Sequence, residues 1–71
     1  MRQRIRLDTL SDIQQFVGAM SKVDDKVYLE DNTGFKVSAT SLLGALLSME
    51  WEEVYIHCDK DISGAILKWI I

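Results

Sequence analysis

The 71-residue chain contains no proline, one cysteine and one histidine. A single cysteine, Cys58, cannot form an intramolecular disulfide, and we expect it to be a small hydrophobic residue buried in a strand. The one histidine, His57, has no further histidine or cysteine near it at the spacing of a zinc site. The chain also lacks a glycine-rich phosphate loop. We therefore expect no metal site and no cofactor.

Positive charge and long apolar runs are scarce as well. The chain has 8 Lys and Arg against 11 Asp and Glu, a net charge of −3, so no broad positive surface attracts nucleic acid. No apolar run approaches the roughly 18 residues that cross a bilayer, and the N-terminus lacks the apolar segment of a signal peptide. We expect a cytoplasmic protein that binds no nucleic acid and does not insert into a membrane.

What is present is the composition of one small globular domain. Hydrophobic residues make up 48% of the chain, an ordinary value for a folded protein, and no linker or low-complexity segment divides the chain. We expect a single domain over residues 1–71. Its stability should be modest, because a chain of this size buries only about 60% of its unfolded surface.

Alternating side chains predict the strands. Residues 3–7 place Ile5 and Leu7 on one face and arginines on the other, as in a strand covered on one side. An anion-binding stripe is one interpretation of the arginines, but we favour ion pairs with acids such as Glu30 on neighbouring strands, which need no ligand. Residues 27–30 and 35–38, joined by turn residues 31–34, predict a hairpin. In the fourth strand, residues 54–58, we expect Tyr55 and His57 to face outward.

Three helices are expected between and after these strands. The segment Ser11-Asp12-Ile13-Gln14 is typical of a capping box with Ser11 as N-cap, followed by an apolar stripe: Ile13, Phe16, Val17 and Met20. Ser41 is a good N-cap for a short helix that is apolar around nearly its whole circumference, so that one face enters the core and another stays outside. A last helix after residues 59–61 would bury Ile62, Ala65, Ile66, Trp69 and Ile70, with Gly64 marking a close helix contact.

The order of these elements is βαββαβα. With helices packed on one face of an antiparallel four-stranded sheet, it predicts an α+β open-faced β-sandwich whose other face meets solvent. A ferredoxin-like fold is the main structural rival, although the final helix and the very short middle helix argue against it.

A family resemblance agrees with this architecture. The run Val37, Ala39, Ser41, Leu42, Leu43 and Gly44, preceded by residues 27–30 and a turn at 32–34, resembles the second half of HPr. HPr is the histidine-containing phosphocarrier of the bacterial sugar phosphotransferase system. The likeness extends back to Phe16 and Val17 and forward to Asp61 and Ala65, and it implies an HPr-like fold in a bacterial protein.

The resemblance does not extend to the catalytic pair of that family. The phosphorylated histidine falls on Thr9 and the following arginine on Ser11, while Asp12 stands where the family usually has proline. A phosphothreonine ester does not readily pass its phosphoryl group onward, and Asp8 and Asp12 would repel an incoming anion. We therefore expect no catalytic residue and no enzymatic activity.

A second family feature falls on Ser41, which aligns with a regulatory phosphorylation site of many HPr proteins. A phosphate at a helix N-terminus is electrostatically favourable, but capping alone also accounts for the serine. Family members meet their protein partners through this short helix. The predicted partner-binding residues are therefore Leu43, Leu46, Leu47, Met49 and Trp51.

The leading hypothesis is a non-catalytic HPr-like regulatory or protein-interaction module, connected with the phosphotransferase system or carbon regulation. One alternative is a phosphocarrier whose acceptor has moved, for which His57 is the candidate. Another is a homodimer or larger homo-oligomer formed through the apolar helix, in which the chain is a structural subunit.

Overall fold

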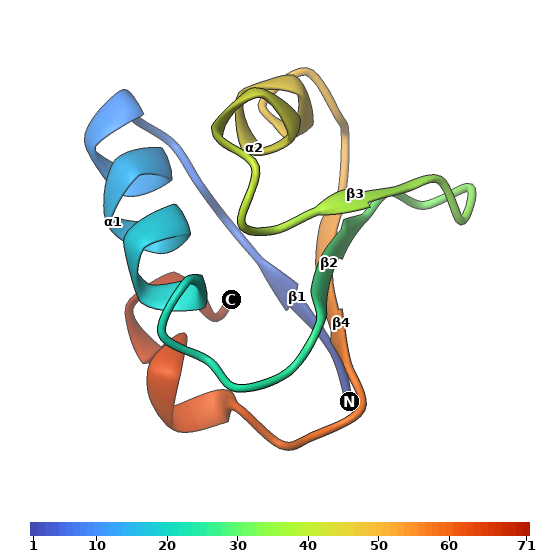
Figure 1. Ribbon diagram of the computed structural model, residues 1–71. Coiled ribbons are helices and arrows are strands. Elements are labelled where there is room, and N and C mark those ends of the chain that lie inside the picture. The colour runs from blue at the N-terminus through green and yellow to red at the C-terminus, as the bar shows by residue number, and fades with distance from the viewer.

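The computed structural model describes all residues, 1–71, and Figure 1 shows the arrangement of its elements. Four strands and two α-helices are followed by two 3₁₀ turns. The elements in chain order are β1 (Arg2–Ile5), α1 (Leu10–Met20), β2 (Val27–Glu30), β3 (Lys36–Ser38), α2 (Leu42–Ser48), β4 (Val54–Cys58), η1 (Ser63–Ala65) and η2 (Leu67–Trp69).

The strands form one antiparallel sheet in the order β1-β4-β2-β3. Alternate side chains of the three longer strands are buried on one face, against which α1, α2 and the C-terminal turns pack (Figure 1). These inward residues are Ile5, Val27, Leu29, Val54, Ile56 and Cys58. The opposite face carries polar and aromatic side chains and no helix covers it. The α+β class, the open antiparallel sheet, the predicted hairpin and the buried Cys58 are thus confirmed.

Helix α1 begins two residues earlier than the sequence predicted. Its N-cap is Thr9, whose hydroxyl accepts a hydrogen bond from the Asp12 amide at 3.0 Å, while the Asp12 carboxylate accepts one from the Thr9 amide at 3.2 Å. The prediction of Ser11 as N-cap was wrong, because the shorter carboxylate of Asp12 closes the box in place of glutamine. Ser11 lies inside the first turn and accepts a bond from the Gln15 side chain.

The C-terminal segment differs most from expectation, because residues 62–70 form two 3₁₀ turns and no α-helix. Asp61 binds the backbone and hydroxyl of Ser63, which tightens the first turn. Beyond the second turn Ile70 is extended and forms a bridge with Ile5 of β1. A continuous helix would carry the chain away from this sheet edge. Nothing lies within 4 Å of a side chain built at Gly64, so the expected close contact there is also absent.

Helix α2 begins as predicted, with the Ser41 hydroxyl accepting a hydrogen bond from the Gly44 amide at 3.1 Å. The close approach in this fold is at Gly44. A Cβ atom there would lie 3.2 Å from the Ser38 carbonyl oxygen and from the Val37 side chain. This glycine lets α2 sit directly against β3, which sets the direction in which its remaining side chains point.

Candidate functional site

Four apolar side chains of α2 and its exit are exposed, and we call them the α2 surface: Leu42, Leu43, Leu47 and Met49. Leu43 is 80% exposed, and Leu42 and Leu47 are each 48% exposed. The opposite side of the same helix is fully buried at Ala45 and Ser48. A helix of seven residues cannot bury apolar side chains around its whole circumference when it lies on one face of a sheet.

The structure divides the predicted partner-binding residues into two groups. Leu43, Leu47 and Met49 belong to the α2 surface, whereas Leu46 and Trp51 are partly buried against the core. Leu42 is exposed but was not in the predicted set. The N-cap at Ser41 was the available signal, because it places Leu42 in the first turn, before the helix reaches its neighbours.

Trp51 is in contact with a second aromatic residue, Phe35. Its ring packs edge-on against Phe35, the residue before β3, with 6.0 Å between the ring centroids. Phe35 is itself exposed. Trp51 therefore connects the hairpin end to the segment that leaves α2.

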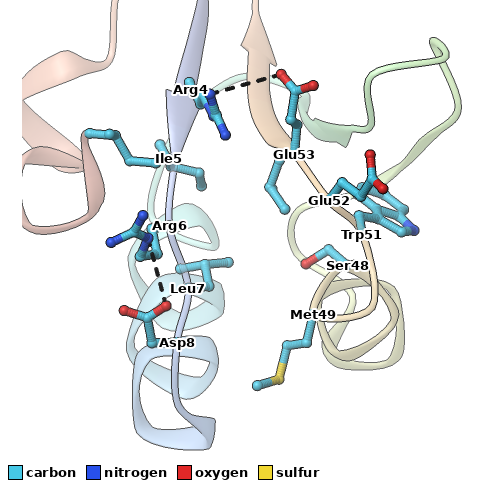
Figure 2. Close-up of a pocket in the computed structure, with 12 residues that line it drawn as sticks. Arg4, Ile5, Arg6, Leu7, Asp8, Ser48, Met49, Trp51, Glu52 and Glu53 are labelled. Carbon is cyan, nitrogen blue, oxygen red and sulfur yellow. Dashed lines mark ion pairs between the residues drawn. The ribbon is translucent and has the colours of Figure 1, made fainter.

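A shallow pocket of about 180 Å³ adjoins Met49 and Trp51 (Figure 2). One side of the pocket is formed by β1 and the residues that follow it, and the other side by the connection from α2 to β4. Its arginines are paired with acids, since Arg4 lies 3.9 Å from Glu53 and Arg6 lies 3.9 Å from Asp8. The pocket thus combines both signs of charge, and it brings the chain entering α1 next to the end of α2.

The residues that the resemblance predicted to correspond to a phosphorylation loop, Thr9, Ser11 and Asp12, lie at the start of α1, where Thr9 and Asp12 form the capping box. The Asp12 carboxylate accepts hydrogen bonds from the amides of Asp8 and Thr9, both at 3.2 Å, and the Thr9 hydroxyl is bound in return. Ser11 bonds to Gln15. The Asp12 carboxylate therefore binds the two amides directly before α1 and places a negative charge at the positive end of the helix, where it would repel an incoming phosphoryl group.

The open face of the sheet brings Arg2, Glu30, Tyr55 and His57 together. Glu30 lies 3.4 Å from the Arg2 guanidinium and 3.3 Å from His57 Nδ1, and Arg2 stacks over the Tyr55 ring at 3.7 Å. Desolvation opposes ionisation of Glu30, but the hydrogen bond with His57 and the charge of Arg2 outweigh it and lower the pKa of this carboxyl. The expected pairing of the arginines with acids is confirmed.

Tyr55 is held in place from its other end by a hydrogen bond from its hydroxyl to Glu53. That bond, with desolvation and the negative charge of Glu53, raises the pKa of Tyr55. The face is therefore a neutralised network of paired charges. His57 belongs to it and lies on β4, away from the loop that precedes α1.

No protein-family model, curated protein or solved structure matches this chain. Neither helix has the length and apolarity needed to span a bilayer. No three His, Cys, Asp or Glu side chains converge in a metal-binding arrangement.

Proposed function

We propose that this protein is a non-catalytic HPr-like interaction module with a regulatory role, which docks on a protein of the phosphotransferase system through the α2 surface. The observation that carries the proposal is the group of exposed leucines on one short helix. Burying a leucine side chain contributes about 1.5–3 kcal/mol, so covering three of them would supply several kcal/mol of binding free energy.

The resemblance to HPr implies that the α2 surface is a site for binding protein partners. Members of that family meet their partners through the corresponding short helix and the beginning of the first helix. Here the pocket beside Met49 includes Asp8, so the end of α2 and the chain that enters α1 are neighbours. The antiparallel open sheet with its helices on one face supports the same reading.

The absence of phosphotransfer is part of the proposal. The Asp12 carboxylate binds the amides of Asp8 and Thr9 directly before α1, and the Thr9 hydroxyl belongs to the same capping box. The relocated acceptor of the alternative hypothesis would be His57. Its ring faces the Glu30 carboxylate, which also holds Arg2, so an incoming phosphoryl group would have to displace an anion already bound there.

The charges around the α2 surface indicate the chemistry of the partner. Helix α2 contains no charged residue. The acids Asp8, Glu52 and Glu53 line the adjoining pocket, where Asp8 is paired with Arg6 and Glu53 with Arg4, so that Glu52 alone has no ion-pair partner there. An apolar patch with basic residues at its rim is the complementary surface. As the partner we propose the first enzyme of the phosphotransferase system, because the resemblance to HPr implies binding of that enzyme through the corresponding helix.

The test is a titration of the ¹⁵N-labelled protein with the purified first enzyme from the same organism, followed by NMR. We expect shifts or broadening at residues 42–49 and none at Tyr28 or His57 on the open sheet face. The Leu43→Asp, Leu47→Asp double variant should bind at least about tenfold more weakly, since two buried apolar contacts are replaced by charges.

Leu67→Asp is the matched control at protein concentrations where the chain is monomeric, because it places the same charge on an exposed leucine of the C-terminal turns and should leave binding unchanged. Equal binding by the wild type and the double variant would overturn the proposed surface. Addition of labelled phosphoenolpyruvate should leave the protein unlabelled. An acid-labile phosphoryl group on His57 would instead establish the relocated phosphocarrier.

A further inference from the structure

A groove of about 580 Å³ lies between α1 and the C-terminal turns. Two glycines line it, Gly18 from α1 and Gly64 from η1, and no atom lies within 4 Å of a Cβ built at either position. Ala19 and Ala65 also line the groove, and Leu67 at its side is 69% exposed. We call this the α1–C-terminal groove. Its small residues allow another backbone to approach closely.

The charge of the groove is opposite to that of the whole chain. Lys22 and Lys68 are the charged residues that line it, and no acid does so. Lys68 Nζ donates a hydrogen bond to the Gln15 side chain at 3.2 Å, which holds one ammonium group over the groove. In a protein with a net charge of −3, this groove is suited to a segment that is apolar and acidic.

The chain itself contains such a segment. The α2 surface ends at Met49 and is followed by two exposed acids, Glu50 and Glu52. Neither acid forms an ion pair within the molecule, whereas the neighbouring Glu53 is paired with Arg4. An apolar helix with two unpaired carboxylates at its exit therefore complements an apolar groove with two lysines.

One copy cannot make this contact with itself. Helix α2 lies at one end of the molecule and the C-terminal turns at the other, with α1 between them (Figure 1). We infer that the α2 surface of one copy, with Glu50 and Glu52, binds in the α1–C-terminal groove of a second copy. This contact rests on the proposed function in one respect, because it buries the same α2 surface that we propose as the docking surface.

The contact would be heterologous, because two different surfaces meet. A pair of copies joined in this way still has one free groove and one free α2 surface, so further copies can add until they close a ring or form an open chain. Association would cover the α2 surface of all but one copy in an open chain. Self-association and binding of the first enzyme would therefore compete.

Charge reversal separates this contact from a symmetric dimer. Lys22→Glu with Lys68→Glu makes the groove acidic, and Glu50→Lys with Glu52→Lys makes the α2 exit basic. Either double variant alone should associate about tenfold more weakly than the wild type, because like charges then face each other. An equimolar mixture of the two should associate again, because each exit then finds a groove of opposite sign.

The measurement is sedimentation velocity of the full chain over a wide concentration range, with circular dichroism to verify that each variant is folded. A monomer at every concentration would overturn the inference. So would association that both charge reversals leave unchanged, which would indicate an isologous contact through α2. Recovery of association in the mixture supports it.

The two proposals fail separately. Lys22→Glu with Lys68→Glu leaves the α2 surface intact, so this variant should still bind the first enzyme. A wild type that binds the first enzyme but stays monomeric would overturn only the self-association. A wild type that associates but does not bind the enzyme would overturn only the proposed partner.

Discussion

At the scale of single residues, carboxylates hold the connections of this small fold in place. Asp12 completes the capping box of α1, and Asp61 accepts bonds from the Ser63 amide and hydroxyl at the first C-terminal turn. Asp31 accepts bonds from the Thr33 amide and hydroxyl at 2.8 and 2.7 Å. The bond from the Thr33 hydroxyl is the main reason why the pKa of Asp31 is lowered, and the amide of Ser63 has the same effect on Asp61. Ionised carboxylates therefore stabilise the folded state, and the protein should lose stability in acid.

The effect of pH on stability can be measured at a single carboxylate, Glu30. Its pKa is lowered in the folded state relative to its ordinary value of 4.5, so its contribution is complete above that value and disappears as the pH falls through the folded pKa. Glu30→Gln should therefore unfold at a lower urea concentration than the wild type at neutral pH. The difference should shrink below pH 4.5.

Chemical denaturation of both proteins across the acid range tests this prediction. Asp31 and Asp61 titrate in both proteins, so their effects cancel in the difference. Arg2, His57 and Lys36 are the charged or titratable groups that act on Glu30. A difference that stays constant with pH would show that the role of Glu30 is packing and not charge.

At the scale of elements, the contact between α2 and β3 decides which side of α2 is exposed. Gly44 permits that contact, with the Ser38 carbonyl oxygen and Val37 at 3.2 Å from the position of an added Cβ. The Ser38 oxygen is also bound by the Ser41 amide, so it cannot move without disturbing the helix start. A side chain at position 44 would have to push α2 off the strand.

Gly44→Ala should therefore destabilise the fold by about 1 kcal/mol, because the cost of overpacking exceeds the gain in helix propensity. Gly18→Ala is the matched control on α1, where no atom lies within 4 Å. It should stabilise the protein by about 0.5–1 kcal/mol. Thermal unfolding of the two variants gives the answer. An equal gain in both would mean that α2 can shift without cost.

At the scale of the whole molecule, the C-terminal segment completes the sheet as well as the core. The Arg6 amide donates a hydrogen bond to the Trp69 carbonyl at 2.8 Å, and Ile70 pairs with Ile5, so the free edge of β1 is covered. The Trp69 ring packs edge-on against Phe16 of α1 at 5.4 Å. The other edge strand, β3, has only three residues, and a short edge gives little template for pairing with other chains.

Trp69→Ala should remove about 3–5 kcal/mol of stability, a large share of what a domain of this size has. Trp51→Ala is the control, because Trp51 is only partly buried and should cost less. Urea unfolding followed by circular dichroism compares the two. A loss of stability for Trp69→Ala no larger than that for Trp51→Ala would contradict this prediction.

The elements could largely be predicted because periodicity and capping chemistry are local. Alternation placed the strands, the stripe of Ile13, Phe16 and Met20 placed α1, and Ser41 placed the start of α2. The cap of α1 was misplaced by two residues, since Thr9 and Ser11 both precede an acid or amide at a suitable distance. The last helix was wrong because an apolar stripe does not reveal that Ile70 pairs with a strand far away in the sequence.

The sequence by itself determined the α+β class, the antiparallel sheet with an open polar face and the buried Cys58, because these depend on residue type and near neighbours. Only the tertiary structure decided that Leu42 is exposed while Leu46 and Trp51 are partly buried, and that Lys22 and Lys68 share a groove. Those properties depend on which elements meet, and Gly44 and the pairing of Ile70 with Ile5 show that contacts between distant residues decide this.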